Sequence, residues 1–299
     1  MKTFLLRVFY FLSAIIPEKF YLRVVFYLRT GYKLNLKNPK TFNEKLQWLK
    51  VNYRDWDYVK LVDKYAVKEY VTNKVGSQYV IPNLGLYKNT SEIDWKALPN
   101  QFVMKVTHDS GGVIVCKDKS TFDIEKAVKK LTHDLHRRYW KYTREWPYKY
   151  TSPRILCEVF INQQDASKDL LDYKFFCFDG VPRLLYVASN RSSGVANFDF
   201  FDLDFNRLDV KNGHPNSKEK LEKPENFQEM IDVAASLSKG MPHVRVDLYN
   251  VDGHIYFGEM TFFHMSGMVS FVPHEFDIQL GNMLVLPNKN RNNDNKVQF

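Results

Sequence analysis

The chain has 299 residues, of which 44% are hydrophobic, and a formal net charge of +9. This length and composition indicate a globular protein with a substantial core in one large or two to three small domains. Cys116, Cys157 and Cys177 lie in separate apolar runs without metal-ligand spacing, which argues against a disulfide framework or a zinc site and favours buried thiols in a reducing cytoplasm.

The first 50 residues hold nearly all of the excess positive charge, because ten Lys and Arg face only Glu18 and Glu44, for a local net charge of +8. Aromatic and aliphatic residues are interleaved with these cations, a mixture that suits the surface of an anionic membrane. The apolar run from Phe4 to Ile16 is shorter than the roughly 20 residues of a spanning helix, and no small-residue cleavage site follows it.

We therefore expect a basic, amphipathic helical region over residues 1–50 of a cytoplasmic protein. This region either packs on the protein's own core or, through residues 1–37, makes peripheral contact with the inner face of the cytoplasmic membrane or with a lipid-linked sugar. Nucleic acid is not expected as a partner, because the rest of the chain carries only about +1 and no recognition motif.

Secondary-structure signals continue along the chain. Thr41 and Glu44 have the spacing of a capping box, so a helix should begin there, and a second helix is expected over 59–74 before Gly76. Strand-like runs occupy 79–82, 101–107, 112–116, 155–161, 172–178, 182–188, 243–249 and 254–262, and helical stretches occupy 123–145 and 225–239. This is an α+β pattern with antiparallel hairpins. The polar, asparagine-rich residues 288–299 are expected to form a disordered tail.

One lysine, Lys105, lies in the expected strand 101–107, just before the loop Asp109-Ser110-Gly111-Gly112. A lysine beside glycine-rich backbone can hold phosphates through its charge and through bare N–H groups. The same pattern also describes a solvated strand residue before an ordinary turn. The residues alone leave both interpretations open.

Three further charged residues occur in or beside apolar strands. Glu158 interrupts the run 155–161, where a carboxylate can meet an adenosine or simply face solvent from an edge strand. Lys174 stands in an aromatic strand and either reaches water or meets an anion. Arg191 follows the returning strand and can bind phosphate or carboxylate bidentately, although an ordinary surface arginine is equally compatible with its position.

The segment 243–261 carries two carboxylates on adjacent strands. With a three-residue loop that places Gly253 in the left-handed region, Arg245 faces Glu259, and Asp247 faces Phe257. Asp247 and Glu259 are then diagonal neighbours on one face, within reach of one magnesium ion, which requires hard oxygen ligands. The competing interpretation is an ion pair between Arg245 and Glu259, which leaves Asp247 unpaired.

In this order along the chain, roughly from 35 to 287, these residues resemble the ATP-grasp superfamily, in the TupA-like branch of teichuronopeptide and surface-polysaccharide biosynthesis. The resemblance implies two α+β subdomains that clasp ATP, behind an N-terminal helical, basic extension. It divides the chain into the extension at 1–50, a preceding region at 51–100, a small subdomain with a flexible glycine loop at 101–154, a large subdomain with the magnesium site at 155–287, and the tail at 288–299.

The resemblance also implies roles for individual residues. The nucleotide-binding set is Lys64, Lys105, Ser110, Gly111, Gly112, Glu158, Val159, Phe160, Ile161 and Lys174, with 158–161 as the adenine hinge. Asp247 and Glu259 resemble the magnesium ligands. Thr261 stands where the family often has asparagine, so a threonine hydroxyl would complete the Mg²⁺ site. Ser266 and Gly267 are expected to contact the acceptor substrate, and Arg191 together with Lys105 to act in catalysis, Arg191 on the γ-phosphate or the substrate carboxylate.

The implied reaction is carboxylate–amine ligation with ATP and Mg²⁺, through an acylphosphate, to an amide. The implied substrates are an amino acid and a uronic acid or amino sugar of a surface polysaccharide. The alternative is a nucleotide-sugar glycosyltransferase, because Asp202-Leu203-Asp204 has the Asp-x-Asp spacing that holds a metal and a diphosphate, although it also suits a strand and turn. A third class, a membrane-docked scaffold without turnover, is suggested only by Thr261.

Overall fold

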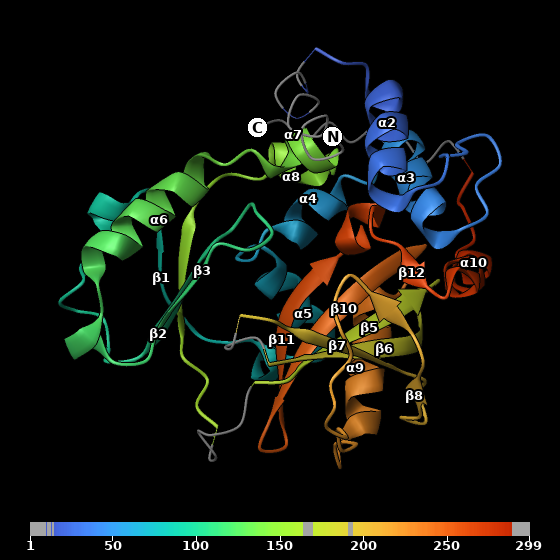
Figure 1. Cartoon of the computed structure of the whole chain (residues 1–299). Helices are drawn as coiled ribbons and strands as arrows, with labels where there is room; N and C mark the ends of the chain where they lie inside the picture. The colour runs from blue at the N-terminus through green and yellow to red at the C-terminus, as the bar shows by residue number, and fades with distance from the viewer. Residues whose placement is uncertain (1–9, 11–12, 14, 164–169, 191–193, 289–299) are drawn as a thin grey trace.

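A computed structural model describes residues 10, 13, 15–163, 170–190 and 194–288. Two antiparallel sheets form its framework, and helices cover them (Figure 1). The helices are α2 (Glu18–Thr30), α3 (Phe42–Asn52), α4 (Asp57–Val62), α5 (Val67–Val75), α6 (Ile124–His136), α7 (Tyr139–Thr143), α8 (Pro147–Tyr150), α9 (Phe227–Ser238) and α10 (His274–Met283). The strands are β1 (Asn83–Tyr87), β2 (Phe102–Val106), β3 (Val113–Cys116), β4 (Ile155–Val159), β5 (Asp172–Phe178), β6 (Val181–Ser189), β7 (Asn197–Phe201), β8 (Arg207–Leu208), β9 (Lys211–Asn212), β10 (His243–Val251), β11 (His254–Thr261) and β12 (Phe271–Val272).

The smaller sheet has four strands in the order β1-β4-β2-β3. It joins β1 and β4, which lie outside the sequence-based unit 101–154, to β2 and β3. Phe102, Met104 and Val106 are buried in a cluster with residues of α6, because alternate side chains of a strand point to one face. The alternation places Lys105 on the opposite face of β2, away from that cluster.

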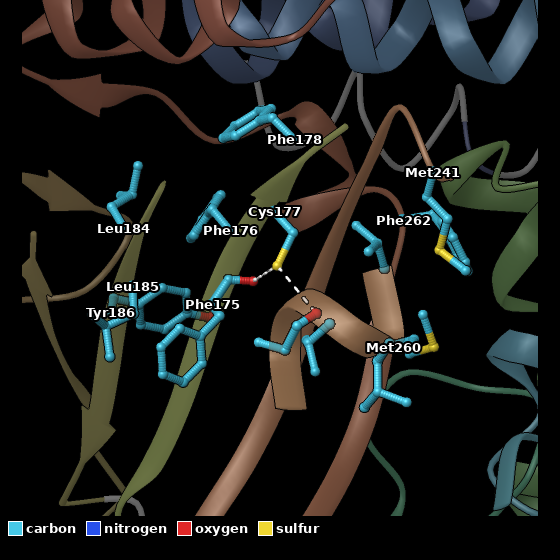
Figure 2. Close-up of a cluster of buried hydrophobic side chains, with 14 of the residues drawn as sticks. Phe175, Phe176, Cys177, Phe178, Leu184, Leu185, Tyr186, Met241, Met260 and Phe262 are labelled. Atoms are coloured by element: carbon cyan, nitrogen blue, oxygen red, sulfur yellow. Dashed lines mark hydrogen bonds between the residues drawn. The ribbon is translucent and has the colours of Figure 1, made fainter. Parts of the chain in front are cut away.

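The larger sheet has six strands in the order β11-β10-β5-β6-β7-β8, and α9 packs on β5, β6 and β10. Figure 2 shows part of the main core on this sheet. There Cys177 is buried, and its thiol contacts the carbonyl oxygens of Phe175 at 3.8 Å and Ala234 of α9 at 3.9 Å. Phe175 and Cys177 share a face, so Lys174 projects to the other side of the sheet. All three cysteines are free and buried, as the sequence predicts.

The hairpin of β10 and β11 differs from its prediction in register. Its loop has two residues, Asp252 and Gly253, both with positive φ (52° and 82°), which is the backbone of a tight, right-twisted hairpin turn. The register also shifts after Asp247, where β11 bulges at Gly258. A Cβ on Gly258 would lie 3.1 Å from the Asp247 carbonyl oxygen, so glycine permits this close approach.

The bulge places Asp247 directly opposite Glu259, not Phe257, and Arg245 opposite Thr261, not Glu259. The expectation that Asp247 and Glu259 share one face is confirmed, whereas the diagonal arrangement was wrong. Residues directly opposite in an antiparallel pair lie closer together than diagonal neighbours.

Three predicted elements are broken in the structure. The helix expected over 59–74 is split into α4 and α5, because the Asp63 carboxylate accepts the backbone N–H groups of Tyr65 (2.8 Å) and Ala66 (3.0 Å), which competes with helix continuation. The helix over 123–145 is divided into α6 and α7, and the strand at 79–82 is replaced by a 3₁₀ turn at Ser77–Tyr79 before β1. The capping box of α3 is present as predicted.

At the N-terminus, α2 packs against the protein itself. Tyr21, Leu22, Val25 and Phe26 are buried in a cluster with Met268, while Phe20 remains 55% exposed. Within the described residues, no helix combines the length and the apolar character that a membrane crossing requires. The predicted tail falls almost wholly on 289–299, outside the described residues.

Candidate active site

Three neighbouring strands bring a row of charges together on the face of the large sheet opposite α9. Asp247 of β10 lies between Lys174 of β5 and Glu259 of β11 in the strand register. The Arg245 guanidinium binds the Asp247 carboxylate with two hydrogen bonds of 2.7 Å and also reaches Glu259 at 3.2 Å. Lys174 forms an ion pair with Asp247, and Arg245 donates to the Thr261 hydroxyl at 3.0 Å. Arg245 therefore connects all three predicted metal ligands.

These contacts set the protonation of the carboxylates. Burial opposes ionisation of Glu259, but the positive charges of Lys174, Lys64 and Arg245 lower its pKa to about 2. Burial raises the pKa of Asp247 to about 6, although Arg245 and Lys174 favour its charged form. Both groups are thus carboxylates at neutral pH.

His264 orients the Arg245 guanidinium through a hydrogen bond. Arginine has no acceptor, so Arg245 must donate to Nδ1 of His264, at 2.9 Å. The proton of the ring is therefore on Nε2, which donates to the Asn212 side-chain oxygen at 2.8 Å. Burial and the charge of Arg245 lower the pKa of His264 well below its usual value, so the ring stays neutral. The sequence assigned no role to His264, because its partners lie on distant segments.

A second charged group lies on the small sheet. Glu158 of β4 pairs with Lys105 of β2 at 2.7 Å and with Lys68 of α5. Burial opposes ionisation of Glu158, but the two lysines lower its pKa below the usual value. Lys68 also donates to the Ile81 carbonyl oxygen at 2.7 Å. Sequence reasoning missed Lys68 entirely, since it lies on a helix with no local motif.

Lys64 lies in the break between α4 and α5 and points toward the glycine loop. Its backbone N–H donates to the Thr107 carbonyl oxygen at 3.3 Å, and its ammonium donates to the Asp109 carbonyl oxygen. Burial lowers the pKa of Lys64, whereas Glu259 acts in the opposite direction. Burial opposes the charge of Lys105, but the ion pair with Glu158 raises the pKa of Lys105 above its usual value, with a smaller contribution from Glu259. The cations of the small-sheet side therefore lie within electrostatic reach of the carboxylates of the large sheet.

Arg137, the residue after α6, binds the glycine loop (109–112) through two contacts. Arg137 pairs with the Asp109 carboxylate and donates to the Ser110 carbonyl oxygen at 2.8 Å. Gly111 and Gly112 have φ values of 102° and 66°, which favour glycine, and a Cβ on Gly112 would lie 3.0 Å from a carboxylate oxygen of Asp134. The loop backbone is thus shaped by contacts that a larger residue would disturb.

The sequence also matches a known family. Residues 44–285 match the model of the TupA-like ATP-grasp family, which is most of the chain. The chain belongs to this family. No curated protein sequence matches it.

Several solved structures are similar to this TupA-like ATP-grasp protein. An L-amino acid ligase from Bacillus licheniformis is 14% identical, with a TM-score of 0.48, over 90% of this chain and 62% of that one. A D-alanine–D-alanine ligase from Helicobacter pylori is 16% identical, with a TM-score of 0.46, over 82% and 69%. The corresponding ligase from Bacillus anthracis is 19% identical, with a TM-score of 0.38, over 68% and 57%. The chain thus spans about three fifths of the length of the first and third of these ligases.

The candidate site on β10 and β11 has oxygen atoms that fit a magnesium ion. A carboxylate offers about four lone-pair positions, and among the described residues Asp247 uses three, one on Oδ1 and two on Oδ2. One position on Oδ1 remains. Glu259 has a side chain that is 36% exposed, and the Thr261 hydroxyl lies 3.4 Å from its Oε1. Within the described residues, no three His, Cys, Asp or Glu side chains form a metal-ligating group, so any Mg²⁺ here would complete its shell with other oxygens.

Of the two predicted acceptor residues, Ser266 lines a cavity of about 500 Å³ next to the glycine loop, and Gly267 is not part of its lining. Ser266 and Ser110 both border it, although they lie far apart in the sequence. Ser266 has a φ of 57°, and its hydroxyl oxygen accepts a hydrogen bond from the Lys50 ammonium at 2.8 Å. Gly267 packs so closely on α3 that a Cβ would lie 2.5 Å from the Gln47 amide nitrogen. We call this space the acceptor cavity.

Three other predicted sites have different outcomes. Arg191 lies outside the described residues. In the Asp-x-Asp segment, the Asp202 carboxylate accepts the backbone N–H groups of Asp204 (3.0 Å) and Asn206 (2.8 Å), which closes an exposed turn after β7. Asp202 thus has the turn-forming role that the sequence offered as the alternative to a metal-diphosphate site. In the hinge 158–161, the Val159 N–H donates to the Pro82 carbonyl oxygen, and Val159, Phe160 and Ile161 are at least partly exposed.

Proposed function

We propose that this ATP-grasp protein is an ATP-dependent carboxylate–amine ligase that forms an amide through an acylphosphate. One observation carries the proposal: the carboxylates of Asp247 and Glu259 on β10 and β11 stand among cations, with Lys174 paired to Asp247 and Arg245 paired to both. A bound nucleoside triphosphate requires cations that neutralise its charge. It also requires carboxylates that ligate the metal ion bound to its phosphates.

The reaction then has two steps. A carboxylate oxygen of one substrate attacks the γ-phosphorus of ATP, the bond to the bridging oxygen breaks, and ADP leaves. The amine nitrogen of the second substrate attacks the acyl carbon and loses a proton as phosphate departs, so that an amide remains. No nucleophilic side chain of the protein takes part, and the protein acts by positioning groups and stabilising charge.

The residues of the chain have distinct roles in this proposal. Lys64 and Lys105 hold phosphate oxygens beneath the glycine loop, whose N–H groups cover them. Lys174 and Arg245, held by Asp247, face the transferred phosphoryl group, and His264 fixes the plane of the guanidinium. Glu259, Thr261 and Asp247 would hold Mg²⁺, which neutralises phosphate charge when bound. The adenine is expected between the hinge 158–161 and the large sheet.

We further propose that the acceptor is a saccharide of a surface polysaccharide and that the reaction joins an amino acid to a uronic acid or an amino sugar. This rests on the family and on the acceptor cavity, where the hydroxyl-bearing residues Ser110, Thr143 and Ser266 are part of the lining. Contact of residues 1–37 with an anionic membrane surface is part of the proposal, supported by the basic charge of this region and by the 55% exposed Phe20.

A thermal-shift comparison tests the nucleotide site. Mg-ATP should raise the melting temperature of the wild type, because a ligand that binds only the folded state stabilises it by mass action. Glu259→Ala should abolish this rise, and Glu219→Ala, at an exposed carboxylate, should leave it intact. Stabilisation by UDP-sugars and not by Mg-ATP would reject the ligase proposal. Release of ADP that depends on both an amino acid and a uronate or amino sugar would then identify the substrates.

A further inference from the structure

A second cavity, of about 410 Å³, borders a different face of α7 from the acceptor cavity. Tyr139, Tyr142 and Thr143 line the acceptor cavity, whereas Trp140 and Arg144 line the second one. Tyr139 and the positions three and four after it share one helix face, whereas Trp140 lies on another, and Arg144 follows the end of α7 with a φ of 59°. The volume is within the roughly 300–1,000 Å³ range of small-molecule sites.

Aromatic rings dominate the lining of this cavity. Trp56, Trp140 and Trp146 are three of the five tryptophans in the chain, and Tyr150 accompanies them. Trp56 packs edge-on against Trp146 and against Tyr150, with ring centres 5.5 and 5.0 Å apart. We call this cavity the tryptophan pocket. Trp56 and Trp140 are half-buried and Tyr150 is 39% exposed, so part of the aromatic surface is open to a ligand.

The tryptophan pocket is also positively charged. Arg54, Arg144 and Lys149 line it, against Glu18 as the one acid among the lining residues. Arg54 lies over the Trp146 ring at 5.1 Å, and Lys149 lies 5.4 Å from the ring centres of both Trp140 and Tyr150. Among the described residues, none of these three cations has a carboxylate within ion-pair distance, in contrast to the lysines of the ATP site.

Two buried donors at this pocket lack acceptors. Trp146 is 6% exposed, and its indole N–H has no hydrogen-bond partner within the described part of the chain. The same holds for Nε of Arg144. Buried donors are nearly always satisfied in folded proteins. Both nitrogens are fully buried, so a ligand would reach them only where the neighbouring side chains move aside.

We propose that the tryptophan pocket binds an anionic sugar unit, a pyranose that carries a carboxylate or a phosphate. The C–H faces of a pyranose pack on the electron-rich faces of aromatic rings. The arginines and the lysine match the anionic group. A membrane surface fits less well, because a concave pocket encloses a ring-sized unit.

This inference deepens the proposed function and rests on it for the identity of the acceptor. A saccharide that passes around α7 can place its reacting unit in the acceptor cavity and a second, anionic unit in the tryptophan pocket. The pocket then selects an oligomeric acceptor over a single sugar. Binding to the pocket itself requires neither ATP nor catalysis.

The test is a tryptophan-fluorescence titration of the full chain at low salt, without nucleotide. The probes are a disaccharide of glucuronic acid and N-acetylglucosamine, the neutral disaccharide of two N-acetylglucosamines, inorganic phosphate, and vesicles of phosphatidylglycerol and phosphatidylcholine. We expect saturable binding of the acidic disaccharide, at least tenfold tighter than that of the neutral one. Phosphate alone should bind at least tenfold more weakly than the acidic disaccharide.

Two variants locate the binding. Trp140→Ala and Lys149→Glu should each weaken binding of the acidic disaccharide at least tenfold, while Trp95→Ala and Lys220→Glu, which change a ring and a charge elsewhere, should not. Lys149 is exposed, so its replacement keeps the fold even if Trp140→Ala does not. Circular dichroism melts on every variant check this.

Several results would overturn the inference: no saturable binding of the acidic disaccharide, equal binding of the neutral one or of phosphate, or binding that both pocket variants leave unchanged. Vesicle binding lost in the pocket variants, without disaccharide binding, would assign the pocket to membrane contact and also overturn it. Thermal stabilisation by Mg-ATP is measured in parallel. Disaccharide binding without any effect of Mg-ATP would support the pocket and refute the ligase.

Discussion

Glu145 provides a quantitative test of the buried charge beneath the acceptor cavity. Its carboxyl group is 2% exposed and accepts the Tyr139 hydroxyl at 3.2 Å. Burial raises the pKa of Glu145 from 4.5 to about 7, and the nearby ammonium of Lys50 offsets only part of this effect. The folded protein therefore keeps a proton on Glu145 between pH 4.5 and 7, where the unfolded chain has lost it.

The sign of the effect follows from this difference. Because the folded-state pKa is raised, the contribution of Glu145 to stability is complete below pH 4.5 and is lost as the pH rises through 7. One pKa unit corresponds to about 1.4 kcal/mol. The free energy of unfolding should thus lose about 3 kcal/mol across this window on account of Glu145 alone.

Glu145→Gln removes the titration and keeps the shape of the side chain and an acceptor for Tyr139. Urea unfolding of the wild type and the variant at half-unit intervals from pH 4.5 to 8 measures the difference, in which titrating groups that do not interact with Glu145 cancel. Lys50 is the exception, because burial lowers its pKa to about 8 and the charge of Glu145 opposes this shift. The wild type should lose about 3 kcal/mol more than the variant between these limits. Parallel pH profiles would show that Glu145 titrates normally and would refute the argument from burial.

Three further predictions concern the candidate active site. Arg245→Met leaves Asp247 with Lys174 as its one cationic partner in the site, so the free energy of unfolding should fall by about 3–5 kcal/mol in urea titrations; a loss below 1 kcal/mol would mean that the pair is not buried as described. Asp63→Ala removes the acceptor for two backbone N–H groups at the break before α5 and should lower the free energy of unfolding by about 1 kcal/mol. The variant should also bind Mg-ATP more weakly, because this break positions Lys64. Unchanged ATP affinity by calorimetry would contradict the role of Asp63 in positioning Lys64. Gly112→Ala should raise the KM for ATP several-fold and lower the melting temperature, because φ is positive there and the added Cβ would lie 3.0 Å from a carboxylate oxygen of Asp134; an unaltered KM would argue against loop contact with phosphates.

Much of the fold was predictable because it depends on neighbouring residues. The strand β5 occupies 172–178 as expected, and the capping box of α3 lies between residues three apart. Errors arose where a polar side chain within a predicted element bound the backbone. Asp63 ends α4 by accepting backbone N–H groups, an event that the apolar periodicity of 59–74 does not report.

The candidate site was predictable only as a set of residue types. The order of Lys64, Lys105, Glu158, Lys174, Asp247 and Glu259 along the chain indicated the family before any geometry was available. The sequence did not show which of these charged side chains form ion pairs with one another. Lys68 binds Glu158, and Arg245 binds Asp247 bidentately in addition to the ion pair with Glu259 that the sequence offered as the competing interpretation.

The amino-acid sequence by itself determined the strand and helix periods, the buried state of the cysteines and the face that Asp247 shares with Glu259, because these follow from residues adjacent in the chain. The tertiary structure alone decided the register at Gly258, the tautomer of His264 and the gathering of Trp56, Trp140 and Trp146 around one pocket. The physical reason is that each of these depends on contacts between segments distant in sequence, which form only when the core brings those segments together.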